Sequence, residues 1–221
     1  MTNKNRPSLG RSKKERGLDL FDTPPGALAP LFEHEPLLTG VKVVSEPFCG
    51  QGNLVITMRQ RGLLVYASDI EPRGCPDSTT LDFRKMTVRP AGCDVLVSNC
   101  AYAGAAGNAL QFIEHALTLE FRVIALLLKI QFLNCYERYQ RLYPRGHLRR
   151  VHVIAERVDG MHDAKHIAAG GKKASQTQCH GWFVFDRNYY GDPKLNFVSI
   201  DQPAERMPWA RGGESTAEAA D

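Results

Sequence analysis

The residues with the clearest chemical potential lie at positions 45–53, which read Ser-Glu-Pro-Phe-Cys-Gly-Gln-Gly-Asn. Glu46 ends a short apolar run, and Gly50 and Gly52 form a Gly-x-Gly turn ahead of a helical pattern. Glycine allows the backbone to pass close under a ligand. A carboxylate just before that turn repels a pyrophosphate but attracts an ammonium group. The turn therefore favours a ligand such as S-adenosylmethionine, which has an ammonium, a sulfonium and no phosphate.

Two other interpretations of the Gly-x-Gly turn stay open. A dinucleotide-binding fingerprint needs a third glycine three residues after the second, and Val55 occupies that position. A turn that binds no ligand and only joins a strand to a helix is also compatible with a lone Gly-x-Gly. The choice depends on the acidic residues that follow.

Two further acidic residues come at the ends of later segments. Positions 63–69 indicate a second buried strand that ends in Asp69, whose carboxylate can accept both hydroxyls of a ribose. Asp82 could accept from an adenine amino group, and the neighbouring Phe83 ring could pack on the base. Each acid alone is also typical of a solvated strand end or a helix cap. Their order after Glu46 favours a nucleoside site.

An apolar segment at positions 93–98 leads to Asn99 and, three residues later, to Tyr102. With the Gly-x-Gly turn, this Asn-Cys-Ala-Tyr segment resembles class I methyltransferases that use S-adenosylmethionine. It is similar in particular to adenine-N6 DNA methyltransferases of phage and mobile DNA, whose motif is Asn-Pro-Pro-Tyr or Asp-Pro-Pro-Tyr. The Asp-Thr-Pro-Pro segment at 22–25 resembles their amino-terminal cofactor segment, and 181–186 resembles their late aromatic strand. The resemblance covers residues 18–200, most of the chain.

The resemblance implies which residues bind the cofactor and which receive the target. Glu46 would hold the methionine ammonium region, Asp69 the ribose and Asp82 the adenine. Thr23 and Pro24 would close over the cofactor. The expected cofactor-binding residues are Thr23, Pro24, Glu46, Pro47, Cys49, Gly50, Gly52, Asp69, Ile70, Asp82 and Phe83. The expected catalytic residues are Asn99, Cys100 and Tyr102.

Both prolines of the family motif are missing, because Cys100 and Ala101 stand in their places. An amine conjugated to a ring is a poor nucleophile, and acceptors for its two N–H groups help its lone pair to attack a sulfonium methyl. The Asn99 side-chain oxygen and the Cys100 backbone carbonyl can be these acceptors, while Tyr102 stacks on a base rotated out of its helix. Prolines would fix the loop in advance. We therefore expect their loss to reduce turnover more than cofactor binding.

The elements that must position these residues alternate between strand and helix. The predicted strands lie near 41–46, 64–69, 94–98, 123–128, 151–155 and 182–185, and the predicted helices near 24–33, 51–61, 106–119 and 133–143. Continuous apolar strands that alternate with helices favour a sheet covered on both faces. The expected fold is α/β and Rossmann-like, as in class I methyltransferases, with a mostly parallel seven-stranded sheet, helices on both faces and an antiparallel last strand.

Composition predicts one globular domain with polar extensions. The chain has 221 residues, 43% of them hydrophobic, and a formal net charge of +4. We expect a flexible basic arm at 1–17, a methyltransferase domain at 18–205 and a disordered tail at 206–221. No apolar run is long enough to span a bilayer and no secretory signal is present, which predicts a cytoplasmic protein with no membrane partner. The six cysteines show no paired spacing, which favours reduced thiols.

The expected partner is nucleic acid, with DNA as the leading substrate. The basic arm and the stretch at 136–150, rich in arginine and tyrosine, suit phosphates and bases. The segment from Glu46 to Tyr102 has no room for a separate target-recognition domain, so the loop at 157–180 or a partner protein would supply specificity. A zinc site is conceivable at His162, His166, Cys179 and His180, but they lie on no convincing helix, and we expect no metal.

Two other functions remain compatible with the sequence. A catalytically impaired protein could keep the methyltransferase fold and bind nucleic acid through its basic surfaces. Methylation of RNA or of a protein glutamine amide would use the same hydrogen-bond acceptors for an amine. Turnover separates the enzyme from the binding protein, and the identity of the methylated atom separates the substrates.

Overall fold

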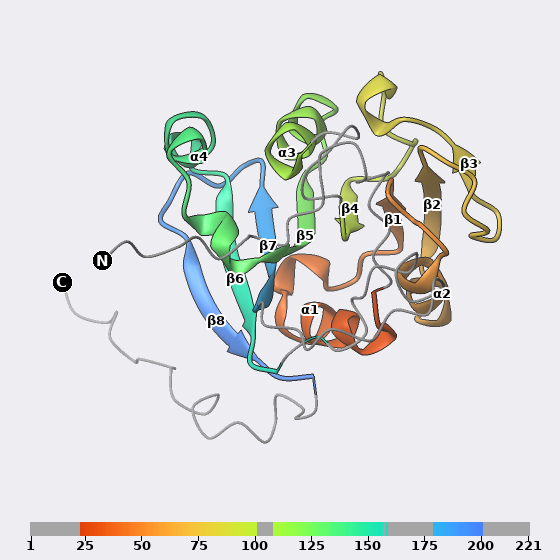
Figure 1. The fold of residues 1–221 in the computed structure, drawn as a ribbon, viewed down its shortest axis with the longest axis horizontal. Coiled ribbons are helices and arrows are strands. Elements are labelled where there is room, and N and C mark those ends of the chain that lie inside the picture. The colour runs from red at the N-terminus through yellow and green to blue at the C-terminus, as the bar shows by residue number, and fades with distance from the viewer. Residues whose placement is uncertain (1–22, 101–107, 157, 159–178, 201–221) are drawn as a thin grey trace, which may run out of the picture.

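The computed structural model describes residues 23–100, 108–156, 158 and 179–200, which form a central β-sheet between two layers of helices (Figure 1). The basic arm, Tyr102, most of the 157–180 loop and the acidic tail lie outside the described residues. Among those described, the strands are β1 (Val43–Glu46), β2 (Leu64–Asp69), β3 (Thr79–Thr80), β4 (Val95–Ser98), β5 (Val123–Lys129), β6 (Leu148–Ile154), β7 (His180–Asp186) and β8 (Lys194–Val198). Their order in the sheet is β3-β2-β1-β4-β5-β7-β6-β8.

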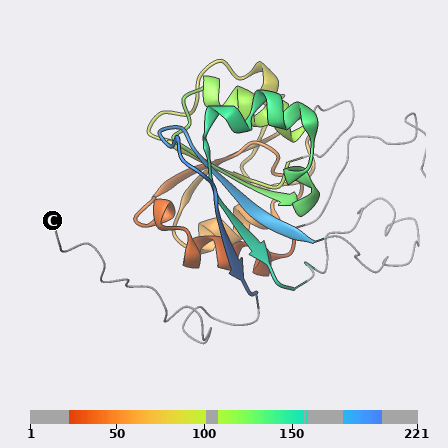
Figure 2. The ribbon, with the colours of Figure 1, turned by 90° about the vertical axis from the view of Figure 1, so that its left-hand side faces the viewer.

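The helices cover both faces of the sheet. They are α1 (Ala29–His34), α2 (Asn53–Gln60), α3 (Ala109–Thr118) and α4 (Tyr136–Arg141), with 3-10 turns η1 (Pro25–Leu28), η2 (Pro36–Leu38), η3 (Phe83–Lys85), η4 (Ile130–Leu133) and η5 (Tyr143–Arg145). Figure 2 shows the layer of α3 and α4 on one side of the strands and the layer of α1 and α2 on the other. The predicted Rossmann-like α/β architecture is confirmed.

Strand direction agrees with the prediction, and the sheet extends beyond it. β7 runs antiparallel to β5 and β6, as expected for the segment at 182–185, and the other pairings are parallel. The sheet has eight strands rather than seven, because β8 follows β7 and pairs in parallel with β6. β8 lies at the edge of the sheet, and its Leu195 and Phe197 side chains are exposed. Its sequence alternates apolar and polar residues, so no continuous apolar run marks this strand.

β2 is less buried than its sequence suggests. Leu64 is 56% exposed and Tyr66 is 41% exposed, whereas Val65 and the last three residues of the strand are buried. Only the two-residue strand β3 pairs with the outer side of β2, at Ser68 and Asp69. One face of the first half of β2 is therefore exposed to solvent, and the predicted fully buried strand is wrong there.

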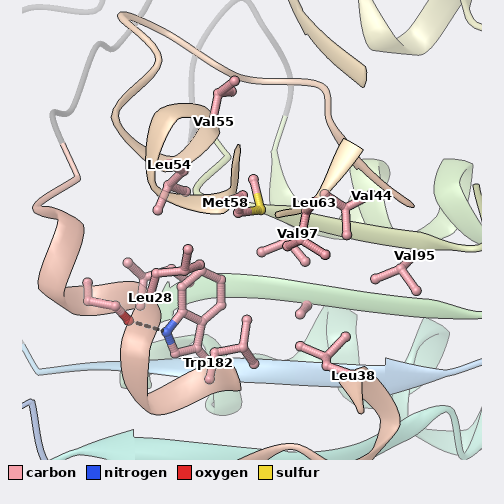
Figure 3. Close-up of a cluster of buried hydrophobic side chains, with 14 of the residues drawn as sticks. Leu28, Leu38, Val44, Leu54, Val55, Met58, Leu63, Val95, Val97 and Trp182 are labelled. Carbon is pink, nitrogen blue, oxygen red and sulfur yellow. Dashed lines mark hydrogen bonds between the residues drawn. The ribbon is translucent and has the colours of Figure 1, made fainter. Parts of the chain in front are cut away.

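Alternate residues of the central strands fill two separate cores. On β4 and β5, Val97 and Ala125 pack with α1 and α2, whereas Leu96 and Ile124 pack with α3. This alternation is the period of two of a β-strand, and it requires apolar residues at every position when both faces are covered. Figure 3 shows the first core, in which Met58 of α2 lies close to Leu63 and Val97.

Strand β7 anchors the segment that begins the described chain. The indole Nε1 of Trp182 donates to the carbonyl of Ala27 in η1 at 2.7 Å, and both residues are buried (Figure 3). A buried indole N–H needs such a partner, so this bond fixes η1 on the sheet. Thr23 lies just before η1, and its position therefore depends on β7.

A buried ion cluster holds the other end of α1. Both carboxylate oxygens of Glu35 accept from Nη1 of Arg150 at 2.8 Å, and Nε2 of His152 lies 3.0 Å from Oε2. Burial acts to raise the pKa of Glu35, but hydrogen bonds from His152 and Arg150 outweigh it and hold this pKa below its ordinary value. Arg150 therefore serves the fold and is withdrawn from the basic surface predicted at 136–150.

Candidate functional site

The candidate site lies where the strand order reverses. β1 stands between β2 and β4, so the chain leaves the middle of the sheet first toward one edge and then toward the other. Ligands of open α/β sheets bind beyond the carboxyl ends of the strands at such a switch point. Glu46 ends β1, Asp69 ends β2 and Asn99 follows β4, so the parallel pairing brings the three predicted residues to one edge.

Glu46 is fully buried and only half satisfied. Its Oε1 accepts from the Ser98 hydroxyl at 2.5 Å and from the backbone N–H of Phe48 at 3.1 Å. Its Oε2 has no hydrogen-bond partner among the described residues. Burial raises the pKa of Glu46 to about 8, and the nearby Asp69 carboxylate contributes to the increase. The carboxyl is therefore mostly protonated at neutral pH, and a cation placed at Oε2 would favour its ionised form.

The Gly-x-Gly turn is conformationally restricted to glycine. Gly50 has φ of 53° and Gly52 has φ of 96°, in the left-handed region. A Cβ on Gly52 would stand 2.8 Å from Sγ of Cys75, so close packing excludes a side chain as well. Cys49 is also buried there, and burial, with the neighbouring Cys75 thiol, raises its pKa. The turn lies between Glu46 and α2. Because its two glycines have no side chains, their backbone is open to close approach by a ligand.

Asp69 is tied to the turn and to a nearby arginine. Its Oδ2 accepts from the Gly50 N–H at 2.9 Å, which links the end of β2 to the turn after β1. Its Oδ1 accepts from the Glu71 N–H and from Nε of Arg73, each at 3.1 Å. The Asp69–Arg73 ion pair is largely buried. Asp69 therefore lies at the carboxyl end of β2 with Arg73 bound to it, and its contact with a ribose stays a prediction.

Asp82 and Phe83 lie in and beside η3. Asp82 caps η3 by accepting from the Arg84 N–H at 3.0 Å, and its carboxylate also binds the Arg84 guanidinium at 2.9 and 2.7 Å. The side-chain hydrogen bond from Arg84 is the main reason that the pKa of Asp82 lies below its ordinary value. The Phe83 ring is buried, edge-on to Phe48 at 5.4 Å. Contact of Phe83 with a bound adenine stays a prediction.

Asn99 contacts the segment before η1. Its Nδ2 donates to Oγ1 of Thr23 at 2.9 Å, across 76 positions of sequence. Thr23 is buried, and Pro24 beside it is partly exposed. Cys100 is buried, and this burial, with the Glu46 carboxyl nearby, raises the pKa of its thiol. Tyr102, the third predicted catalytic residue, lies outside the described residues.

The remaining predicted cofactor residues flank this group. Pro47 is buried directly after Glu46, and Ile70 is partly exposed directly after Asp69. The structure thus brings Thr23 into contact with Asn99 and joins Gly50 to Asp69. It also places the Ser98 hydroxyl against the Glu46 carboxyl.

Three residues that were not predicted from the sequence contact the predicted ones. Ser98 binds Glu46, Arg73 binds Asp69 and Arg84 binds Asp82. Spacing could have suggested two of them, because Arg73 is four positions after Asp69 and Arg84 is two after Asp82. Ser98 has no such signal, since it lies 52 positions from Glu46 and meets it only through the pairing of β1 with β4.

The basic stretch at 136–150 is largely occupied by internal contacts. Arg141 forms ion pairs with Glu114 and Glu137, and Arg149 pairs with the buried Asp186. Tyr136 and Tyr139 are 72% and 66% exposed and stack on each other. The exposed part of this stretch therefore includes both tyrosines, together with Arg141 and Arg145.

Solved structures with a similar fold include several methyltransferases. The type I restriction-modification methyltransferase subunit from Streptococcus thermophilus has a TM-score of 0.55 and 11% identity over 83% of this chain and 48% of its own. This chain therefore spans about half the length of that subunit. A protein assigned as an RNA methyltransferase from Pyrococcus horikoshii has a TM-score of 0.54 and 14% identity over 76% of this chain and 88% of its own.

The same fold also occurs outside named methyltransferases. A protein assigned as a hemolysin from Lactococcus lactis has a TM-score of 0.54 and 10% identity over 78% of this chain and 91% of its own. No family model and no curated protein matches the sequence. At such low identities the likeness establishes the Rossmann-like fold of these methyltransferases, and the function must be argued from the site.

Three further observations concern partners. No helix in the described ranges is long and apolar enough to cross a membrane. The part of the chain that the structure describes contains no group of three His, Cys, Asp or Glu side chains arranged to hold a metal. Of the histidines and cysteine weighed for zinc, His162 and His166 lie outside that part. All six cysteines are free thiols.

Proposed function

We propose that this protein is an S-adenosylmethionine-dependent N-methyltransferase that acts on an exocyclic amino group, with N6 of adenine in DNA as the leading target. The observation that carries the proposal is the grouping at the switch point of a buried acid with an orphaned oxygen, a glycine-only turn and an asparagine amide. A cation-binding element thus lies one strand away from an acceptor for an amine. This combination suits methyl transfer to nitrogen.

The residues present fit the cofactor. The orphaned Oε2 of Glu46 can accept from the ammonium of its methionine part, which would compensate a buried polar atom. The glycine-only backbone at Gly50 and Gly52 allows close approach, and Asp69 stands at the end of β2 to accept from a ribose. When bound, the cofactor supplies an activated methyl group on a sulfonium.

Asn99 has the chemistry to receive an amine. A side-chain amide that donates through Nδ2 also has Oδ1, which accepts an N–H from the target. The Cys100 carbonyl is a second acceptor one residue on. Together they would draw the lone pair of the amine out of conjugation and orient it for attack. The product can then lose its proton to water, so the mechanism requires no basic side chain.

Nucleic acid is the proposed partner, and DNA the leading one. The chain shares its fold with a methyltransferase subunit of a restriction-modification system, and its sequence motif resembles that of adenine-N6 enzymes. The exposed Tyr136 and Tyr139 rings offer faces on which bases can stack. We further propose that a partner protein supplies sequence specificity and that the protein acts in the cytoplasm. RNA and protein glutamine are the substrates to test next.

A combined binding and transfer experiment tests the proposal. The purified chain is titrated with S-adenosylmethionine by calorimetry, and transfer of labelled methyl to unmethylated double-stranded DNA is followed in the same preparation. Binding with transfer to adenine N6 supports the proposal. Binding with transfer only to RNA or to a glutamine peptide changes the substrate, and absence of binding refutes the assignment of Glu46 and Asp69.

The second candidate is a nucleic-acid-binding protein without turnover. Two arginines favour it, because Arg73 and Arg84 already neutralise the carboxylates proposed for ribose and adenine. The replacement of proline by Cys100 favours it too, since the loop after Asn99 lacks a pre-set φ. This candidate predicts DNA binding with no methyl transfer to any amine, and with the same DNA affinity whether or not the cofactor is present.

A further inference from the structure

We infer that Arg73 limits how the proposed cofactor pocket holds a ribose, because its guanidinium occupies an acceptor position on Asp69 that a second hydroxyl would need. The inference rests on the proposed function, which assigns the ribose to Asp69. Two adjacent ribose hydroxyls that both donate to one carboxylate need two free acceptor positions. Counted over the described residues, the contacts of Asp69 leave one such position while Arg73 stays bound.

The hydrogen bonds of Asp69 carry this count. An ionised carboxylate has about four acceptor positions, two on each oxygen. Oδ1 accepts from the Glu71 N–H and from Nε of Arg73, each at 3.1 Å, so both of its positions are filled. Oδ2 accepts from the Gly50 N–H at 2.9 Å and has no other partner within the described ranges. One position on Oδ2 is therefore left for a ligand.

The three donors to Asp69 differ in how readily they can be exchanged. Gly50 and Glu71 donate through backbone N–H groups, so these bonds break only if the turn after β1 or the end of β2 changes its path. Arg73 donates through its side chain, which can change rotamer without any change of backbone. A ribose that uses both hydroxyls on Asp69 must therefore displace Arg73.

A second carboxylate is placed to receive the displaced guanidinium. Nη2 of Arg73 lies 3.4 Å from Oε2 of Glu71. The Glu71 side chain is 49% exposed, whereas the side chains of Arg73 and Asp69 are 8% and 12% exposed. Displacement would thus leave Arg73 with an exposed ion pair in place of a largely buried one, and exposed pairs contribute little. The loss of the buried pair opposes binding of the second hydroxyl.

Removal of Arg73 should therefore strengthen ligand binding, although it takes a contact away from the protein. Arg73→Met keeps most of the side-chain length and removes every donor. S-adenosylhomocysteine is the probe, because its sulfur is neutral and the loss of a nearby arginine charge does not act on a sulfonium. A hydrogen bond to a charged acceptor changes affinity about 10- to 100-fold, so calorimetry should give a Kd at least about tenfold lower for Arg73→Met.

A pair of nucleosides isolates the contribution of the hydroxyls. Adenosine carries both hydroxyls and 2′,3′-dideoxyadenosine carries neither, and each is titrated into the full chain by NMR. Arg73→Met should bind adenosine about tenfold more tightly than the natural chain and 2′,3′-dideoxyadenosine within about twofold of it. Arg59→Met is the matched control, because it removes the same charge from an arginine that contacts Pro76 and Asp77 instead of Asp69. Its affinities should stay within about twofold of the natural chain.

Glu71→Gln supplies a second variant, at an exposed side chain. It keeps the backbone N–H that binds Asp69 and removes the carboxylate that receives Arg73, so displacement becomes less favourable. We expect it to bind S-adenosylhomocysteine about two- to fivefold more weakly than the natural chain. Added to Arg73→Met, the same substitution should change the Kd by less than about twofold, because no guanidinium is left to receive.

The outcomes separate the inference from the proposed function. Tighter binding by Arg73→Met without methyl transfer to any amine supports the inference and refutes the proposed function. Methyl transfer by the natural chain, with no tighter binding by Arg73→Met, overturns the inference alone. An equal gain for adenosine and its dideoxy analogue overturns it as well, because the gain would not depend on the hydroxyls. If urea unfolding shows that Arg73→Met does not fold, Glu71→Gln decides, and an unchanged Kd in that variant overturns the inference. Absence of binding of S-adenosylhomocysteine to the natural chain and to every folded variant refutes both.

Discussion

The pH dependence of stability offers the sharpest test of the site, through Glu46. In the structure its carboxyl is fully buried, and its pKa is raised from 4.5 to about 8, mainly by burial. A group whose folded pKa lies above its unfolded pKa binds more protons in the folded state between those values. The contribution of Glu46 to the stability of the cofactor-free protein must therefore fall as pH rises from about 4.5 to about 8.

The expected magnitude follows from the pKa. The unfolded pKa is 4.5 and the folded pKa is about 8, so Glu46 ionises in the unfolded state while it stays mostly protonated in the folded state. This difference lowers the free energy of unfolding by about 1 kcal/mol at pH 5 and by about 3 kcal/mol at pH 7. Glu46→Gln cannot ionise, so it removes this dependence. The free energy of unfolding of the natural chain should therefore fall by about 2 kcal/mol more than that of the variant between those pH values.

Urea unfolding at pH 5 and pH 7 measures the difference. Glu46→Gln leaves the other titrating groups in place. The difference between the two proteins in the change of unfolding free energy from pH 5 to pH 7 therefore isolates Glu46. The glutamine changes absolute stability as well, because it buries an amide, but that change is independent of pH. An equal change in unfolding free energy for both proteins would refute the raised pKa of Glu46.

Cofactor binding gives a second arm of the same test. A cationic group at Oε2 would lower the pKa of Glu46, so binding at pH 7 should release about 0.9 of a proton from the natural chain. The Glu46→Gln variant should bind more weakly and release none. Calorimetry in two buffers of different ionisation enthalpy counts the protons. Proton uptake, or equal release by both proteins, would contradict the proposed contact.

Three further predictions concern neighbouring residues. Asp69→Ala should weaken cofactor binding at least about tenfold, whereas Asn99→Ala should keep the cofactor Kd and abolish transfer; loss of both in the Asn99 variant would contradict this division, and calorimetry with a transfer assay decides it. Gly52→Ala should destabilise the protein by about 2 to 4 kcal/mol in urea unfolding, because of its positive φ and the contact with Cys75, and unchanged stability would disprove the close packing. Trp182→Phe should cost about 2 to 4 kcal/mol and shift the NMR signals of η1, since it orphans a buried carbonyl; a loss below about 0.5 kcal/mol would show that the anchor is dispensable.

Much of the fold could be predicted because its apolar runs are continuous. β5 is buried at nearly every position, so its apolar run marks it in the sequence. β2 and β7 each end at an aspartate, which marks the carboxyl end of the strand. The helix predicted at 133–143 was less accurate, because η4, α4 and η5 divide the segment, and Pro144 limits its end. The edge strands β3 and β8 escaped prediction, since an edge strand needs no continuous apolar run.

The sequence by itself determined which chemical groups are available at the site. A glutamate before a Gly-x-Gly turn, an aspartate after the next strand and an asparagine after a later one indicate a cationic nucleoside and an amine, because charge and hydrogen-bonding capacity belong to side chains. The tertiary structure alone decided how these groups are satisfied. The Ser98–Glu46 and Asn99–Thr23 contacts join segments 52 and 76 positions apart. No local pattern encodes such contacts, since they arise from strand pairing and from the anchoring of η1 on β7, and burial in that arrangement also sets the pKa of Glu46.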